Sequence, residues 1–420
     1  MTDSRAALFS LEQIGIKLGL EQIQALLTEL HRPDRSFPSV VVAGTNGKGS
    51  TSAMIERGLR AAGYRTGRYT SPHLVRVEER VAIDGEPVTA EAFDAAMNRV
   101  LAAARQLPAP PTFFEATTAI ALDTFRTAQV QVAILEVGLG GRLDATNAVD
   151  ATAAAITSID FDHEAYLGHT LEAIAGEKAG VIKRGQVVVL AENPVVVDEV
   201  VRATCDARGA RLIRAGADVT MDVASIDGRT RLALRTPQRN YGVLTLSLRG
   251  RHQAQNAVTA VRMLESLDGR EGLTVGADAV RVALEDAVWP ARLELRTTAR
   301  GRVLLDGAHN PAGARTLAAY VRETYGRALP FVIGMMADKD MTGIVRPLAE
   351  VASHVFAVPV HSPRAAAPEA IAAIVRQVAP EVPVSVATDP SSAVSDARQL
   401  GDPVVVAGSL YLAGEVRDLL

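Results

Sequence analysis

Between residues 44 and 51 the chain reads Gly44-Thr45-Asn46-Gly47-Lys48-Gly49-Ser50-Thr51. The β-branched run at residues 40–43 predicts a buried strand before it, and the apolar spacing over residues 50–62 predicts a helix after it. In this context glycines let backbone N–H groups approach phosphate oxygens, and the helix N-terminus adds positive potential. Lys48 could reach terminal phosphates and Ser50 could ligate Mg²⁺. The pattern predicts a phosphate-binding loop rather than a solvated turn.

The alternation of strand and helix recurs along the chain. Apolar runs at residues 130–137, 153–159 and 187–190 predict further buried strands. Such strands are typical of a mostly parallel sheet that is covered on both faces. Residues 218–248 instead alternate in short segments with turn residues, which predicts a small antiparallel patch. We therefore expect an N-terminal α/β domain that carries the phosphate loop on its central sheet.

A second βα series follows and predicts a smaller, Rossmann-like α/β domain at the C-terminus. A chain of 420 residues exceeds what one hydrophobic core usually organises. We therefore expect two domains, residues 1–292 and residues 293–420. The apolar runs that predict the C-terminal strands lie at residues 302–306, 331–335, 354–358, 382–387 and 403–407.

Composition excludes several classes of protein. Apolar residues make up 48% and charged residues 22% of the chain, which excludes wholesale disorder. The 44 basic and 48 acidic residues give a net charge of -4, without the basic excess of a nucleic-acid binder. The single cysteine, Cys205, cannot form an intrachain disulfide. Residues 1–11 do not resemble a signal peptide and no apolar run reaches membrane-spanning length, so we expect a cytoplasmic protein without nucleic-acid or membrane partners.

The loop differs from the standard phosphate loop because Gly49 separates Lys48 from Ser50. This spacing resembles the ATP-dependent amide ligases of the Mur ligase superfamily, and especially their folate branch, the folylpolyglutamate and dihydrofolate synthases. Further blocks resembling that branch follow in order over most of the chain. They read Ser71-Pro72-His73-Leu74 with Glu79-Arg80, Glu136-Val137-Gly138-Leu139-Gly140-Gly141-Arg142-Leu143-Asp144-Ala145-Thr146-Asn147, Thr157-Ser158-Ile159 with Asp162-His163, Gly176-Glu177-Lys178-Ala179-Gly180, His252-Gln253 with Asn256-Ala257, and Asp306-Gly307-Ala308-His309-Asn310-Pro311.

The resemblance implies a monomeric ligase that uses ATP and two Mg²⁺ sites. It would add L-glutamate to dihydropteroate and to the γ-glutamyl tail of reduced folates through an acyl phosphate. ATP is needed because a carboxylate is a poor electrophile. Alternatives are a folylpolyglutamate synthase alone, a Mur-type ligase for UDP-linked sugar peptides, and a nucleotide-dependent switch. A dinucleotide oxidoreductase is disfavoured, because a phosphate-loop lysine has no role there.

Candidate metal ligands are oxygen and nitrogen donors near the loop. Glu136 and His163 follow predicted strands, where α/β sheets place ligands, and Glu115 is a further carboxylate. The resemblance implies magnesium ligands at Ser50, at Glu115 or Glu136, and at His163. It also implies a carbamylated Lys178 that helps to bind a second Mg²⁺. Carbamylation requires a neutral amine, whereas a lysine near a helix C-terminus is equally well explained as a surface residue.

The resemblance implies three catalytic residues. Lys48 would neutralise charge during phosphoryl transfer, and His163 and Lys178 would act through metal. The linker Trp289-Pro290-Ala291-Arg292 departs from the usual P-G-R of the family, and alanine lacks the access of glycine to positive φ. The residues expected to contact ATP are Gly44, Thr45, Asn46, Gly47, Lys48, Gly49, Ser50, Thr51, Asn256, Arg292, Asp306 and His309.

The sequence indicates the folate site less clearly than the phosphate loop. Aromatic side chains stack on flat heterocycles, and Asp160 could face the donor edge of a pterin. Core packing explains Phe113-Phe114 equally well, and capping of the next helix would explain Asp160. The residues expected to contact the folate are Ser71, Pro72, His73, Arg80, Phe114 and Asp160.

Overall fold

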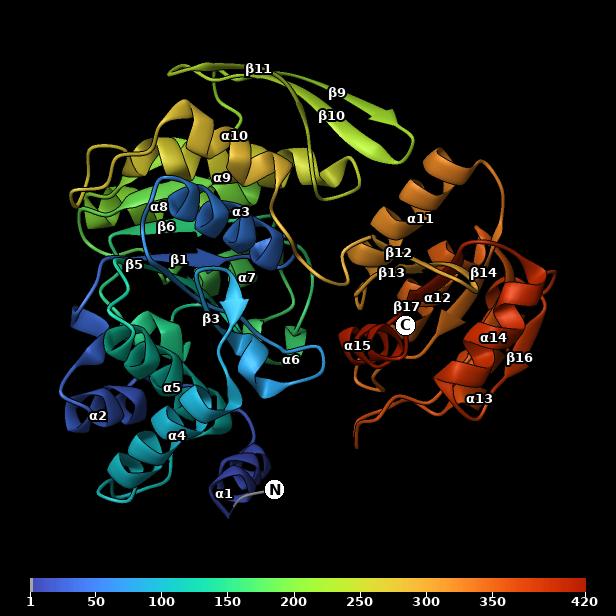
Figure 1. The fold of residues 1–420 in the computed structure, drawn as a ribbon, viewed down its shortest axis with the longest axis horizontal. Helices are drawn as coiled ribbons and strands as arrows, with labels where there is room; N and C mark the ends of the chain where they lie inside the picture. The colour runs from blue at the N-terminus through green and yellow to red at the C-terminus, as the bar shows by residue number, and fades with distance from the viewer. Residues whose placement is uncertain (1–2) are drawn as a thin grey trace.

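A computed structural model describes residues 3–420 and arranges them around three sheets (Figure 1). Residues 1 and 2, which belong to the N-terminal stretch tested for a signal peptide, lie outside the described residues. Figure 1 shows two α/β parts side by side, with the orange and red part formed by the last third of the chain. Within residues 3–420 no helix is long and apolar enough to cross a membrane.

The first sheet has eight strands in the order β4-β3-β2-β5-β1-β6-β7-β8. The six strands from β2 to β8 in this order are parallel, whereas β3 and β4 pair antiparallel at one edge. The strands are β1 (Ser39–Ala43), β2 (Thr66–Tyr69), β3 (Val81–Ile83), β4 (Glu86–Pro87), β5 (Val132–Glu136), β6 (Ala153–Ile156), β7 (Val187–Leu190) and β8 (Arg211–Arg214).

Helices cover both faces of this sheet, which confirms the predicted arrangement. Val40 and Val42 of β1 pack into a core with α3, α9 and α10, while Val41 faces a second core with α1, α2, α4 and α5. The helices of this part are α1 (Asp3–Ser10), α2 (Glu21–Glu29), α3 (Lys48–Ala61), α4 (Ala90–Ala104), α5 (Phe113–Thr127), α6 (Glu164–Leu167), α7 (Leu171–Ala179), α8 (Val195–Arg208), α9 (His252–Leu267) and α10 (Ala277–Glu285), with short 3₁₀ turns η1 (Leu11–Ile14), η2 (Pro33–Arg35), η3 (Val77–Arg80) and η4 (Ala145–Ala148).

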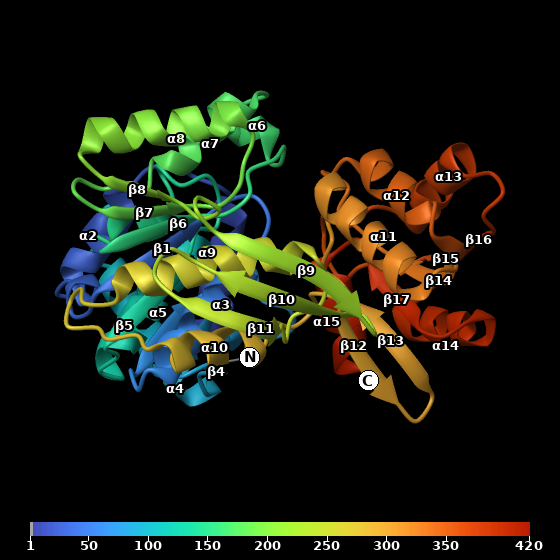
Figure 2. The ribbon, with the colours of Figure 1, turned by 90° about the horizontal axis from the view of Figure 1, so that it is seen from above.

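The predicted antiparallel patch is a three-stranded sheet, β9 (Thr220–Ile226), β10 (Arg229–Arg235) and β11 (Asn240–Thr245). Figure 2 shows that the β9–β10 hairpin extends toward the C-terminal part. There the hydroxyl of Tyr320 donates a hydrogen bond of 3.2 Å to the carbonyl of Gly228. The patch therefore forms one contact between the two α/β parts.

The third sheet has the order β12-β13-β17-β14-β15-β16, parallel apart from the β12–β13 hairpin. The predicted fold class is thus confirmed, and the division at residues 292/293 stays a prediction. The strands are β12 (Glu294–Thr298), β13 (Gly301–Leu305), β14 (Leu329–Ile333), β15 (Ala352–Ala357), β16 (Val384–Val386) and β17 (Val404–Ala407), and the helices are α11 (Pro311–Tyr325), α12 (Met341–Ala349), α13 (Pro368–Val378), α14 (Pro390–Leu400) and α15 (Leu410–Asp418).

Candidate active site

The glycine-rich loop turns between the carboxyl end of β1 and the start of α3. Gly44 and Gly47 adopt φ values of 145° and 87°, which side chains rarely allow. A Cβ at Gly44 would also collide with Oγ1 of Thr157. The backbone N–H groups of Thr45 and Asn46 donate to the carbonyl of Ser158 at 2.8 and 3.3 Å. The loop is therefore fixed against the segment that follows β6.

Lys48 is the first residue of α3, and its ammonium group folds back over the loop. Nζ donates to the carbonyl oxygens of Gly44 at 3.2 Å and Thr45 at 3.1 Å. A phosphate group on the loop would therefore compete with two carbonyls for a cation that is already in place.

The next helix in contact with the loop is α9, which brings the predicted Asn256 to it. Nε2 of Gln253 lies 3.3 Å from the hydroxyl of Ser50, and Nδ2 of Asn256 donates to Oε1 of Gln253 at 3.0 Å. Ser50 is buried, and Oγ1 of the neighbouring Thr51 is buried without a hydrogen-bond partner in the part of the chain that the structure describes. The first turn of α3 therefore carries polar groups that are not satisfied by the protein alone.

Lys178, in the last turn of α7, reaches the same loop. Its side chain is 5% exposed, and Nζ donates to the carbonyl of Gly44 at 2.9 Å. Burial, assisted by the charge of Lys48, lowers the pKa of Lys178 to about 7. The alternative of a surface lysine is therefore wrong. A part of the amine is neutral at neutral pH, as carbamylation would require.

Glu136 ends β5 beside the phosphate loop. It is 5% exposed, and its Oε2 has no hydrogen-bond partner among residues 3–420. Burial raises the pKa of Glu136 to about 7, although the charges of Lys48 and Arg292 oppose this shift. A buried carboxylate oxygen without a partner, next to a phosphate loop, fits a divalent cation, which takes oxygen ligands.

Glu115 is placed differently. Its Oε2 accepts hydrogen bonds of 2.8 Å from both the N–H and the hydroxyl of Thr112, and these bonds close a capping box at the start of α5. The contacts therefore favour Glu136 over Glu115 as a metal ligand, and ligation by Glu115 stays a prediction.

His163 is the N-cap residue before α6 and has a φ of 52°, and its N–H donates to Oδ1 of Asp162 at 2.9 Å. Burial lowers the pKa of His163 to about 4 despite Asp162, so the ring is neutral at pH 7, as a metal ligand must be. Across residues 3–420 no group of three or more His, Cys, Asp and Glu side chains could hold a metal. A magnesium site here would therefore need phosphate oxygens of the nucleotide as further ligands, which is how proteins commonly bind this ion.

Two residues of the C-terminal part, Asn310 and Lys339, contact Asp162, which lies beside the phosphate loop. We call these three residues the latch. Asn310 caps α11, and its Nδ2 donates to Oδ1 of Asn46 at 3.0 Å and to Oδ2 of Asp162 at 3.3 Å. Nζ of Lys339 donates to Oδ1 of Asp162 at 2.8 Å. Burial opposes ionisation of Asp162, but the charge of His163, whose ring is protonated at the low pH where Asp162 titrates, and the charge of Lys339 hold the pKa of Asp162 below its usual range. Sequence analysis placed Asp162 and Asn310 only within motif blocks and missed Lys339.

Replacing Lys339 with methionine is expected to lower the free energy of unfolding by about 1–3 kcal/mol, because the partly buried carboxylate of Asp162 is left without its cation. Arg315→Met is the matched control, since Arg315 meets Asp160 at 3.5 Å across the same interface with exposed side chains. Arg315→Met should lower the free energy of unfolding by less than about 0.5 kcal/mol. Urea unfolding measures both variants, and equal losses would contradict a special role of the partly buried pair of Asp162 and Lys339.

The structure shows how the linker accommodates Ala291 in place of the glycine expected from the family resemblance. This residue adopts a φ of 53°, the region that glycine enters most easily. Its N–H donates to Oε2 of Glu294 at 2.9 Å, and its carbonyl accepts from the N–H of Gly307 at 2.8 Å and from Nη1 of Arg292 at 2.9 Å. Three hydrogen bonds therefore hold this alanine in a left-handed backbone conformation.

Asp306 and His309 lie directly after β13. The carboxylate of Asp306 accepts hydrogen bonds of 2.9 Å from the N–H groups of Leu293 and Ala308, so one oxygen binds the end of the linker and the other binds the turn after β13. Nδ1 of His309 lies 2.7 Å from the carbonyl of Gly307, and burial lowers the pKa of His309 to about 4. Contact of these two residues with ATP stays a prediction.

The residues expected to bind the folate surround the end of β2. Nε of Arg80 donates to Nδ1 of His73 at 2.9 Å, and the ring of Phe114 lies 5.9 Å from that of Tyr69. Ser71 and Pro72 form the turn between them, and the C-terminal α15 packs on this segment, since a Cβ at Gly414 would collide with the carbonyl of Leu74.

Asp160 lies beside the phosphate loop, where its carbonyl accepts a hydrogen bond of 3.0 Å from the hydroxyl of Thr45. The N-cap residue of α6 is His163, so the capping alternative for Asp160 is wrong.

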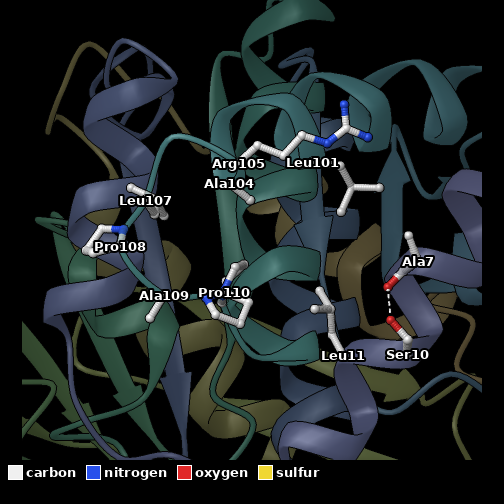
Figure 3. A pocket seen from close by; sticks show the side chains of 11 residues that line it. Ala7, Ser10, Leu11, Leu101, Ala104, Arg105, Leu107, Pro108, Ala109 and Pro110 are labelled. Carbon is white, nitrogen blue, oxygen red and sulfur yellow. Dashed lines mark hydrogen bonds between the residues drawn. The ribbon is translucent and has the colours of Figure 1, made fainter.

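A separate hollow of about 370 Å³ lies between α1, α4 and the segment after α4. Figure 3 shows Leu11, Leu101 and Leu107 around it. None of the predicted site residues lines this hollow. The candidate site is therefore defined by the contacts around the phosphate loop.

Comparison with known protein families matches both parts of the chain. Residues 42–264 match the Mur ligase middle domain, and residues 291–410 match the glutamate ligase domain of Mur ligases. A probable bifunctional folylpolyglutamate synthase/dihydropteroate synthase of Halobacterium salinarum is 38% identical over 98% of this chain, which spans 50% of that relative's length. The dihydrofolate synthase/folylpolyglutamate synthase of Bacillus subtilis is 32% identical over 100% of this chain and 98% of its own.

Solved structures are similar over the whole chain. Mycobacterium tuberculosis folylpolyglutamate synthase complexed with ADP has a TM-score of 0.91 and 34% identity, over 99% of both chains. A bifunctional folylpolyglutamate synthase/dihydrofolate synthase with Mn, AMPPNP and L-glutamate bound has a TM-score of 0.85 and 33% identity, over 100% of this chain and 98% of that one.

Proposed function

Because the chain belongs to the folylpolyglutamate synthase and dihydrofolate synthase branch of the Mur ligase family, we propose that it is an ATP-dependent ligase that adds L-glutamate to dihydropteroate and to the γ-glutamyl tail of reduced folates. One observation carries the proposal beyond family membership. Asn310 of the C-terminal part donates directly to Asn46 of the phosphate loop. A second part closed on the phosphate loop can shield an acyl phosphate from water.

The proposed reaction has two steps. A carboxylate of the pteroate or folate attacks the γ-phosphorus of ATP, which forms an acyl phosphate and releases ADP. The α-amine of glutamate then attacks the acyl carbon, and phosphate leaves from the tetrahedral intermediate. No protein nucleophile is required. Binding and orientation of the reactants, together with neutralisation of phosphate charge, are therefore the main tasks of the chain.

We assign these tasks to residues around the loop. Lys48 exchanges its carbonyl partners for phosphate oxygens, and the N-terminus of α3 adds positive potential. Ser50, Glu136, His163 and the carbamate of a carbamylated Lys178 would hold Mg²⁺. When bound, this ion neutralises charge on the phosphoryl group during transfer. The latch keeps the C-terminal part closed over the loop while the acyl phosphate exists.

The assignment of Glu136 predicts a difference between two isosteric variants. Glu136→Gln should weaken binding of Mn²⁺ in the presence of ADP by about tenfold, since an amide oxygen is a weaker ligand than a carboxylate. Glu115→Gln should leave this affinity unchanged and alter stability little, because the amide oxygen of glutamine can also accept the bonds that close the capping box. Paramagnetic measurement of bound Mn²⁺ separates the two variants, thermal unfolding reports their stability, and a reversed pattern would assign the metal to Glu115.

The overall activity is tested by ADP release from purified protein with Mg²⁺, ATP and glutamate, using dihydropteroate and tetrahydrofolate as acceptors in parallel. We expect glutamate-dependent turnover with both. Turnover with tetrahydrofolate alone would restrict the protein to tail extension. Silence with both acceptors would contradict the proposal.

Finer properties are proposed on the same basis. We propose a monomer that acts in the cytoplasm without nucleic acid, with domains divided at residues 292/293. A single cysteine, Cys205, which is buried in α8, supports a reducing compartment. The match of residues 291–410 to a separate family domain supports the division.

A further inference from the structure

The chain has a single tryptophan, Trp289, in the linker between α10 and β12. Its indole is partly buried and packs against the core around α3, whereas the side chain of its neighbour Val288 is 73% exposed. Neither the phosphate loop nor the metal ligands explain why a large aromatic side chain occupies this position.

The indole occupies the space beside the first turn of α3. A Cβ at Gly49 would lie 2.5 Å from Cε2 and Nε1 of Trp289, closer than side chains tolerate. Gly49 is the residue by which this loop departs from the standard phosphate loop, and it separates Lys48 from Ser50. The extra glycine therefore leaves space for the indole, and the linker contacts the loop between Lys48 and Ser50.

Arg68 of β2 holds the indole from a second direction. Its guanidinium lies 4.9 Å from the ring centroid, which is a cation–π contact. Arg68 is buried, its only ion pair is a contact of 3.4 Å with Glu56, and its Nε has no hydrogen-bond partner in the described chain. A buried cation with so little compensation gains from the face of an aromatic ring, so Trp289 is fixed in one position.

The linker after Trp289 is held rigidly and therefore couples the position of the indole to that of Arg292. Ala291 is held by three hydrogen bonds, and the N–H of Leu293 is bound by Asp306. Arg292 lies between these fixed points, and its charge acts on Glu136. A shift of the indole would therefore move Arg292 relative to the phosphate loop.

We propose that Trp289 is a positioning residue for phosphoryl transfer, whose contacts with Gly49 and Arg68 fix Arg292 relative to the turn that carries Lys48 and Ser50. The proposal rests on the proposed ligase activity and adds a residue that acts through Arg292. It also accounts for the glycine between the lysine and the serine of this loop.

Trp289→Ala should lower kcat at least about tenfold while the KM for ATP and the Kd for ADP change less than about threefold, because positioning acts mainly on the transition state. Trp289→Phe should retain kcat within about threefold, since a ring remains for Arg68. Val288→Ala is the matched control in the same linker, and its kcat and KM for ATP should equal those of the wild type. If Trp289→Ala lowers only the melting temperature and keeps kcat, the role is structural and the proposal fails.

Two further readouts separate this proposal from the activity on which it rests. Gly49→Ala should lower kcat strongly in the wild type but add less than about threefold in the Trp289→Ala background, and additive effects would contradict the contact. ADP titrated into the wild type should change the emission of the sole tryptophan with saturation. Unchanged emission while calorimetry reports bound ADP would overturn the proposal. Absence of turnover in the wild type would instead contradict the ligase assignment, and the emission titration would still judge the role of Trp289.

Discussion

Replacing Lys48 with alanine is expected to lower the rate of ADP formation at least about a thousandfold, because the charge at the transferring phosphoryl group is lost. Among the described residues, Nζ donates hydrogen bonds only to the carbonyls of Gly44 and Thr45, so it can move to a phosphate without breaking an ion pair. The same contacts imply that the variant folds, since the loop is fixed independently through Ser158. ADP release with dihydropteroate and glutamate measures the loss, and circular dichroism reports the fold.

Arg57→Ala on the same helix is the matched control for loss of a cation. Arg57 pairs with Asp286, whose side chain is 65% exposed, and such pairs contribute little. Its ADP release should stay within about threefold of the wild type. If Lys48→Ala retained more than about a tenth of the activity, the loop would not be the phosphate-transfer site.

Much of the fold could be predicted because buried parallel strands carry continuous apolar runs. β1, β5 and β7 have this character and were found with their flanking loops. β2 was missed, although all four of its residues, Thr66 to Tyr69, are buried. Its Arg68 is buried only because Glu56 and Trp289 meet it in the folded chain, and no local pattern reports such tertiary partners.

Some residues of the candidate site could likewise be predicted from the sequence, and others could not. Residues that follow a predicted strand, such as Glu136 and His163, could be placed at one sheet edge, because parallel strands end together. Lys339 follows β14 in the other sheet, and only the closure of the two parts brings it to Asp162. One signal was available: the chain has five lysines among 44 basic residues, at positions 17, 48, 178, 183 and 339. Three of the five meet at the phosphate loop and the latch.

Lys178→Ala is expected to lower ADP formation about a hundredfold and to be partly rescued by formate or acetate, if a carbamate on Lys178 is a metal ligand. The buried Nζ leaves a space beside the carbonyl of Gly44 that a short carboxylate could enter. Carbamate forms only on a neutral amine. Because the pKa of Lys178 is lowered to about 7, the neutral fraction, and with it the wild-type activity, should rise with pH between about 6 and 8.

Two variants separate the carbamate from a simple positive charge. Lys178→Arg keeps the charge but can neither form a carbamate nor leave space for formate, so it should be inactive with and without the added carboxylate. Lys183→Ala is the matched control, because Lys183 lies after the same helix and donates to the carbonyl of Asn147, away from the loop. It should show no response to formate. Full activity of Lys178→Arg would assign Lys178 the role of a cation, and failure of formate to restore Lys178→Ala would remove the support for a carbamate ligand.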